Sequence, residues 1–335
     1  MKVKVRSHVS AVVIFAVVAV LSACSSPAPS PAEAGASTSN TASLTKVTVG
    51  VIPETQLAPM FLGMDTGIFA KHGLELDVVP QNDVASIVSG VASNHYQFGF
   101  ATAVHLINSV ANHIPVKAVA TVDGASNGDT GNALVAGAKS GIKAVKDLAG
   151  KTVAVVGLSS LNTLTTYAMA ARAGIDYKTI KLVQLPFGQM PAALKADTVD
   201  AAVIQNPFVA PAISDGGTLI ANGNKEIFPN TTALAMFLTS DPFIASNPKA
   251  VQGFADAMVE SQDYALKHVE EAKKTLISHL QLTAEAAESA EFCLNCGRYI
   301  TAKGLQDVEE VMKKFAGLKE TIAVKDLVFS GALGH

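Results

Sequence analysis

The chain has 335 residues, of which 49% are hydrophobic and 16% charged, with 25 basic against 28 acidic residues. This length and apolar content suffice for one large core or two medium ones. The acidic balance and the lack of clustered lysines and arginines argue against nucleic-acid binding, which needs such clusters to neutralise phosphates.

The amino-terminal segment, residues 1–23, is predicted to be a secretory signal peptide. Lys2, Lys4 and Arg6 form a basic start, and residues 9–20 form an uncharged apolar run. That run is too short for a membrane-spanning helix, which needs roughly 20 residues. Without the three basic residues the chain carries 22 basic and 28 acidic residues, a net charge near −6.

Residues 24–44 are predicted to be a lipid-anchored flexible tether. The stretch Leu21-Ser22-Ala23-Cys24 resembles the bacterial lipobox, in which the cysteine becomes the lipid-modified first residue of the mature protein. The alternative is an ordinary cleaved signal with an incidental cysteine. The following Ser-, Pro- and Ala-rich stretch cannot bury enough apolar surface to fold. We therefore expect a membrane-anchored protein on the extracytoplasmic face, with Cys24 as the lipidation site.

The first half of the remaining chain alternates strands and helices. The apolar patterns predict strands over residues 46–52, 74–79 and 96–100, with helices over 58–64, from the cap Asp83 to about 92, and from Thr102 onward. The same order recurs from Lys151: strands over 151–157, 180–185 and 199–205, with helices over 160–173, 191–196 and from Pro207. Two such units predict an α/β fold with two lobes, each a parallel sheet covered on both faces.

Further strand-like runs at residues 116–123, 132–136 and 231–240 lie between and after these units. They predict two extended crossings that join the lobes as a two-stranded hinge. From Asn247 the chain reads as mostly helical. We therefore expect lobe 1 over residues 45–129 plus 237–335, and lobe 2 over 130–236, with a cleft between them.

Ligands of open parallel sheets bind beyond the carboxyl ends of the strands. The residues predicted to bind ligand there are mostly uncharged and polar: Gln56, Thr102, Ser159, Ser160, Asn162, Thr163, Gln189 and Asn206, with Phe208. Helix amino termini at Thr102, Ser160 and Asn206 favour an anionic or strongly polar group, although each residue is equally explained as a helix cap.

Arginine is rare after the tether, where Arg172 and Arg298 both lie outside the predicted ligand loops. A bidentate guanidinium clamp is therefore not expected, and an anion would be held by backbone NH groups, hydroxyls and amides. Phe187 and Phe208 near the cleft could instead stack on an aromatic ring.

The sequence predicts no metal and no cofactor. Cys293 and Cys296 form either a disulfide or two buried thiols, because zinc would need two further ligands that no nearby histidine pair supplies. The four residues His72, His95, His105 and His113 follow no metal-binding spacing and are interpreted as surface or packing residues. Gly150-Lys151-Thr152 lacks the earlier glycine of a phosphate-binding loop.

Six stretches carry a family resemblance, which covers residues 46 to about 260. They are APMFLGMDTGIFAKHGLEL (58–76), SGV (89–91), YQFGFA (96–101), PVKAVA (115–120), DLAGKTVAV (147–155) and VDAAVIQNP (199–207). With them the chain resembles solute-binding proteins of the nitrate/sulfonate/taurine class of ABC importers, which share a domain with thiamine-pyrimidine-binding proteins. The resemblance implies a type II periplasmic-binding-protein fold that closes on its ligand.

The leading functional hypothesis is a non-enzymatic, monomeric solute-binding lipoprotein that delivers a small organic anion, alkanesulfonate-like or of the nitrate/taurine type, to an ABC permease and its ATPase. The alternative ligand is a thiamine-precursor pyrimidine or another small aromatic. Two other functions stay open: a pyrimidine synthase-like enzyme, and a surface sensor that kept the fold.

Overall fold

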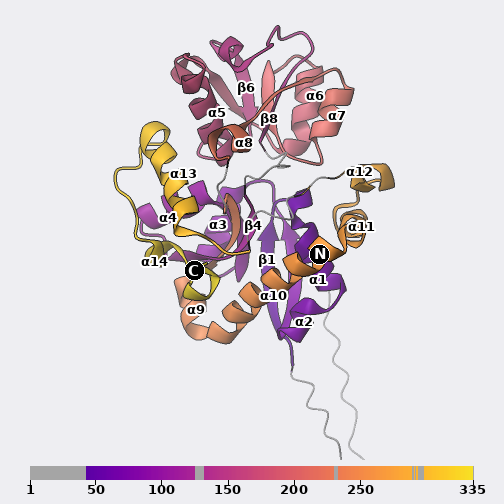
Figure 1. Ribbon diagram of the computed structural model, residues 1–335, viewed down its shortest axis with the longest axis vertical. Helices are drawn as coiled ribbons and strands as arrows, with labels where there is room; N and C mark the ends of the chain where they lie inside the picture. Colours follow the sequence, from indigo (N-terminus) through magenta and orange to yellow (C-terminus); the bar gives the residue numbers. More distant parts are fainter. Residues whose placement is uncertain are drawn as a thin grey trace, which may run out of the picture. The chain divides into compact units, whose positions relative to one another are not determined.

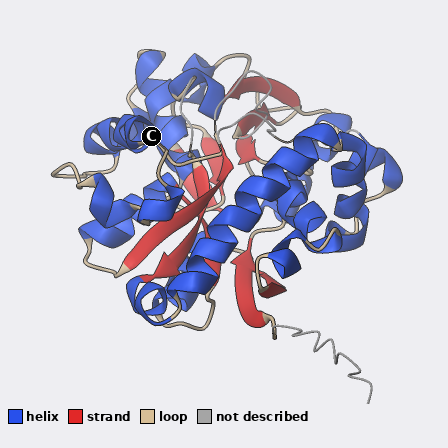
Figure 2. Ribbon diagram, turned by 60° about the horizontal axis from the view of Figure 1, so that its bottom comes forward, coloured by secondary structure: helices blue, strands red, loops and turns tan. Residues whose placement is uncertain are grey.

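The computed structural model describes residues 43–334 apart from 125–131, 230–232, 289, 291 and 293–297. The predicted signal peptide, Cys24, nearly all of the tether, Cys293 and Cys296 lie outside the described residues. Within residues 43–334 the strands form two five-stranded sheets with helices around both (Figure 2). This is the α/β class that the alternating pattern predicts.

The first sheet has the strand order β2-β1-β3-β10-β4. β1 pairs in parallel with β2 and β3, whereas β10 is antiparallel to both β3 and β4. The strands are β1 (Thr45–Val51), β2 (Leu74–Pro80), β3 (Phe98–Thr102), β4 (Val116–Asp123) and β10 (Ala235–Ser240).

The second sheet repeats this plan in the order β7-β6-β8-β5-β9. β6 pairs in parallel with β7 and β8, and β5 is antiparallel to β8 and β9. The strands are β5 (Ala133–Ala136), β6 (Thr152–Val155), β7 (Lys181–Gln184), β8 (Ala201–Ile204) and β9 (Thr218–Asn222).

The expectation of purely parallel sheets is wrong, because each sheet contains one reversed strand. β5 is the first strand after the chain leaves the first sheet, and β10 is the first strand after it returns. β10 lies between β3 and β4 in the first sheet, and β5 lies between β8 and β9 in the second. Since Ala235 and Met236 pair with β3, the lobe boundary predicted after residue 236 lies two residues too late.

The helices begin and end close to the predicted positions. Ser160 caps α5 through its Oγ, which accepts from the Thr163 NH, and Gly174 follows this helix with a left-handed φ of 80°. In the first half the helices are α1 (Ala58–Asp65), α2 (Ile68–Lys71), α3 (Val84–Ala92) and α4 (Ala103–Ala111). In the second they are α5 (Leu161–Arg172), α6 (Met190–Lys195), α7 (Val209–Ser214) and α8 (Gly223–Ile227).

The carboxyl-terminal region is mostly helical, and its longest helix packs against the first lobe. α10 (Pro248–Lys267) buries Val251, Phe254, Met258 and Ser261, which recur at three- to four-residue spacing and so share one face. That face contacts α1 and β4 (Figure 1). The other helices are α9 (Asp241–Ser246), α11 (Val269–Leu280), α12 (Ala284–Glu288), α13 (Ala302–Phe315) and α14 (Val324–Leu327).

Helix α13 contacts both lobes, through α4 of the first and α5 of the second. At its end, the ring of Phe315 meets the ring of Tyr177 edge-on, with 5.3 Å between centroids. The sequence predicted that the carboxyl-terminal region returns to the first lobe. Helix α13 also contacts the second lobe. Every helix in the described part of the chain is too short or too polar to span a bilayer.

Candidate functional site

A small enclosed cavity lies where the strands of the two sheets end. From the first sheet it is lined by Phe100 and Thr102 of β3 and Asp123 at the end of β4; from the second it is lined by Val156 after β6 and Gln205 after β8. Its volume is about 30 Å³, room for about two water molecules. Its position at the carboxyl ends of the parallel strands is the one that the sequence predicted.

Two wider cavities adjoin this central cavity and share residues with it. One, of about 240 Å³, shares His105 and Ser160 with the central cavity and extends to Ser159. The other, of about 280 Å³, shares Ile52 and Phe187 and extends to Gln189 and Phe208. The three cavities together form a cleft with walls from both lobes.

The predicted binding residues divide into three groups. Thr102, Ser160 and Asn162 line the central cavity. Ser159, Gln189 and Phe208 line the two adjoining ones. Gln56, Thr163 and Asn206 are not among the described residues that line these three cavities. Ligand binding by each of the nine predicted residues remains a prediction.

Two residues of the third group have contacts that stabilise the walls. Thr163 donates from Oγ1 to the Gly157 carbonyl at 2.9 Å, and so fixes the turn before α5. Gln56 is buried and donates from Nε2 to Oε1 of Gln205 at 3.5 Å. Gln56 thus reaches the cavity through a residue that lines it.

The acidic groups of the central cavity are not among the residues predicted to bind ligand. Glu54 precedes the short 3-10 helix Thr55–Leu57, and Asp123 ends β4; both are buried and line the cavity. Their positions at or just beyond the ends of buried strands were a usable signal, because polar residues there lie at the ligand edge of a sheet. From the loop that contains Glu54, only Gln56 was predicted to bind ligand.

Four buried side-chain amides form a network across the second-lobe wall. Asn132 accepts at Oδ1 from Nδ2 of Asn162 and from Nε2 of Gln205, the latter at 3.5 Å, and donates from Nδ2 to Oδ1 of Asn224 at 2.5 Å. Asn132 has a left-handed φ of 57°, a conformation that asparagine adopts more readily than most residues. The network aligns residues from the crossing, α5, α8 and the loop after β8.

Burial shifts the titration of two groups in the cavity. It raises the pKa of Glu54 from 4.5 to about 8, because the charged carboxylate loses its hydration. His105 is only partly exposed, and burial lowers its pKa from 6.5 to about 4, with Asp83 acting in the opposite direction. Its Nδ1 lies 2.8 Å from Oγ1 of Thr102. His105 is therefore a neutral cavity residue near pH 7.

The described residues do not bring together three or more His, Cys, Asp or Glu side chains in a metal-binding arrangement. The predicted lipidation site Cys24 and the pair Cys293 and Cys296 fall outside the described residues and remain predictions.

Comparisons with known proteins agree on the family and the fold. A family model described as NMT1/THI5 like matches residues 54–272. A candidate binding protein of Brucella abortus (strain 2308) is 22% identical over 277 residues, which is 79% of this chain and 84% of that protein.

Two solved structures share the fold. The alkanesulfonate-binding protein SsuA of Xanthomonas axonopodis pv. citri, bound to MOPS, has a TM-score of 0.70 at 18% identity, covering 88% of this chain and 99% of that one. A ligand-binding component of an ABC-type import system of Staphylococcus aureus, with zinc bound, has a TM-score of 0.72 at 14% identity, covering 85% and 96%. Both comparisons match the periplasmic-binding-protein fold expected from the sequence.

Proposed function

This chain belongs to the NMT1/THI5-like family, and from that premise we propose that it is an extracytoplasmic solute-binding protein of an ABC importer. It captures a small solute between its two lobes and delivers it to a membrane permease. The observation that carries the proposal is the enclosed polar cavity whose walls come from both sheets. In this proposal the protein binds and releases its solute without catalysing a reaction.

The cleft suits capture by closure. Gln56 of the first lobe donates to Gln205 of the second, and the two walls meet around a cavity of about 30 Å³. A ligand enclosed there exchanges water contacts for amide, hydroxyl and ring contacts from both lobes. In this proposal lobe 1 comprises residues 45–129 with 235–335 and lobe 2 comprises 130–234, which places the whole of β10 in lobe 1.

Ligand-dependent melting tests the function. A ligand at about a hundred times its Kd stabilises a protein by about 2.7 kcal/mol, which raises the melting temperature by several degrees. The panel contains alkanesulfonates, taurine, nitrate, a thiamine-precursor pyrimidine and amidinium salts. A rise with any of them supports solute binding, and no rise with any of them contradicts it.

The sequence-based prediction of an alkanesulfonate-like anion as the ligand stays a prediction. The alkanesulfonate-binding neighbour supports it only through the shared fold. Phe187, which lines both the central and one adjoining cavity, favours the alternative of a small aromatic ligand. The pyrimidine synthase-like alternative would be supported by an absorbance band from bound pyridoxal phosphate in the purified protein, and the sensor alternative by the absence of neighbouring permease and ATPase genes.

The membrane anchor is a separate part of the proposal. Lipidation of Cys24 would hold the protein beside its permease, with residues 25–44 as the tether. The Cys24→Ala variant should leave the membrane fraction while its ligand affinity stays unchanged. A loss of affinity in that variant would contradict the separation of anchor and binding domain.

A further inference from the structure

The charge of the central cavity decides which solutes it accepts. Glu54 and Asp123 are its acidic lining residues, and the described lining contains no lysine or arginine. An anion in this cavity would therefore lie close to two carboxyl groups without a cationic side chain among the described lining residues.

Histidine does not supply the missing positive charge near neutral pH. His105 lines the cavity from α4, where Thr102 contacts its ring nitrogen and Asp83 lies on the side of the adjoining cavity. Because burial lowers the pKa of His105 to about 4, its ring is neutral at pH 7. The electrostatic character of the lining is consequently neutral to negative.

One buried amide oxygen behind the second-lobe residue Gln205 has no donor among the described residues. The side-chain nitrogens of Gln56, Asn132, Asn162 and Gln205 each donate to a neighbouring amide oxygen. Oε1 of Gln56, in contrast, is buried and has no hydrogen-bond partner among the described residues. A buried acceptor without a donor is costly, so an N–H group that reached Oε1 of Gln56 beside Gln205 would be stabilising.

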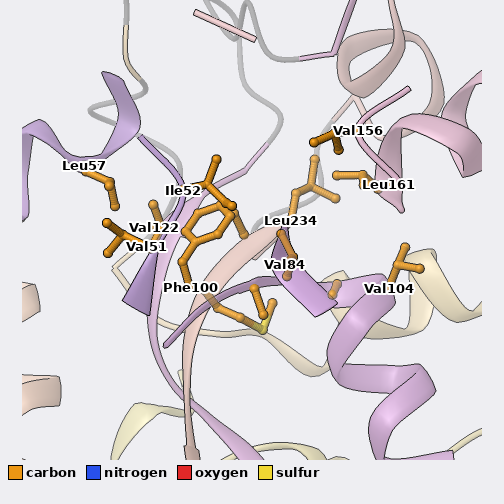
Figure 3. Packing of buried hydrophobic residues seen from close by; sticks show 14 of the residues in the cluster. Val51, Ile52, Leu57, Val84, Phe100, Val104, Val122, Val156, Leu161 and Leu234 are labelled. Carbon is orange, nitrogen blue, oxygen red and sulfur yellow. The ribbon is translucent and has the colours of Figure 1, made fainter. Parts of the chain in front are cut away.

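The apolar part of the lining is compatible with a flat ligand. Phe100 and Ile52 come from the first lobe, Val156 and Leu161 from the second, and Leu234 directly precedes β10. Figure 3 shows these side chains around the same space. The faces of Phe100 and Phe187 can also attract a cation through their π electrons. A planar cation with N–H groups at its edge can donate to the carboxyl groups and lie against the aromatic rings of the lining.

We propose that the central cavity binds a small solute carrying a planar amidinium or guanidinium group, with Glu54 and Asp123 as the hydrogen-bond acceptors. This inference rests on the proposed solute-binding function and specifies its ligand class. Carboxylates pair with such groups through two parallel N–H···O bonds, which provide both charge and shape selection. The wider adjoining cavities hold the remainder of a larger solute.

The experiment uses three planar probes of equal size and different charge: guanidinium, urea and nitrate. Their binding to the purified protein is measured by titration calorimetry at pH 6, 7, 8 and 9, with acetamidinium and benzamidinium as additional probes. The proposal predicts that guanidinium or an amidinium binds at least tenfold more tightly than urea, and that nitrate does not compete. Tighter binding of nitrate, or no binding of any guanidinium or amidinium probe, overturns it.

The pH dependence identifies Glu54 as an acceptor. The empty cavity holds a proton on Glu54 below its pKa of about 8, so a cation must displace it. Affinity should rise close to tenfold from pH 6 to 7, level off above pH 8, and binding near pH 7 should release about one proton. Asp83, Asp123 and His105 are the other titratable groups at these walls. The affinity of Glu54→Gln should therefore stay flat from pH 6 to 9.

Two variants complete the test. Glu54→Gln should lose at least tenfold in affinity at pH 8 together with the proton release, and Asp123→Asn should lose affinity without changing the proton release. Glu75→Gln, on the exposed surface of β2, is the matched control and should bind as the parent does. Unchanged affinity in Glu54→Gln overturns the assignment. Binding of an alkanesulfonate alone would overturn this inference while leaving the proposed function intact, whereas failure of the whole melting panel would remove both.

Discussion

Gln56 and Gln205 lie 149 residues apart in the chain and connect the two lobes through a hydrogen bond from Nε2 to Oε1, 3.5 Å long. Gln205 in turn donates from Nε2 to Oδ1 of Asn132, which belongs to the amide network of the second lobe. One continuous chain of amides therefore runs from Gln56 in the first lobe to the second-lobe wall of the cavity. Disturbing that chain should affect stability and binding together.

Replacement of Gln205 by alanine should destabilise the protein. The variant leaves buried hydrogen-bonding groups of Gln56 and Asn132 without this partner, which costs about 1–3 kcal/mol. Urea unfolding followed by circular dichroism measures the loss. Gln189→Ala, at an exposed site in the same cleft, is the control and should change stability by less than about 0.5 kcal/mol. Equal stability of Gln205→Ala and the parent would show that the amide chain contributes nothing.

Glu54 should make the folded state less stable as the pH rises. Its pKa in the folded protein, about 8, lies above the ordinary value of 4.5. Between pH 4.5 and 8 the folded state keeps a proton on Glu54 that the unfolded state releases. The free energy of unfolding is therefore unaffected by Glu54 below pH 4.5 and falls as the pH rises toward 8. Glu54→Gln removes this dependence and should be more stable than the parent by up to about 4 kcal/mol at pH 8. Parallel stability curves for the two proteins from pH 5 to 8 would contradict the assignment.

Phe254 should be among the residues most important for the stability of the first lobe. Its ring stacks on Phe98 with centroids 3.9 Å apart and meets Phe237 edge-on at 5.2 Å, which fixes α10 on the sheet. Truncation to alanine should cost about 3–5 kcal/mol. Phe254→Leu keeps most of the volume and should cost clearly less. Calorimetric unfolding compares the two variants, and a small loss in Phe254→Ala would mean that α10 repacks.

Asp83 should stabilise α3 as its amino-terminal cap. Its Oδ1 accepts from the Ser86 NH at 2.7 Å and its Oδ2 accepts from the Ser86 hydroxyl at 2.8 Å. Asp83→Ala should cost about 1 kcal/mol, whereas Asp83→Asn should retain most of the cap. Thermal melts of both variants measure the difference. If alanine and asparagine are equally destabilising, charge rather than capping explains the role of Asp83.

The sequence by itself determined the local elements of this protein. The strand Val116–Asp123 was predicted residue for residue, and α5 was predicted with its cap Ser160 and its terminating Gly174. These features depend on side-chain periodicity and capping, which neighbouring residues encode. The edge of the sheets where the cavity lies followed from the same pattern, because parallel strands present their carboxyl ends together.

Only the tertiary structure decided the reversed strands and the charge of the cavity. β10 enters the first sheet from the second lobe and β5 enters the second sheet from the first, so their direction depends on the crossings and not on strand propensity. Glu54 and Asp123 come from strands that are separated in the first sheet by β3 and β10. Their positions near strand ends could be read from the sequence, but local sequence patterns do not encode that both residues line the same buried cavity.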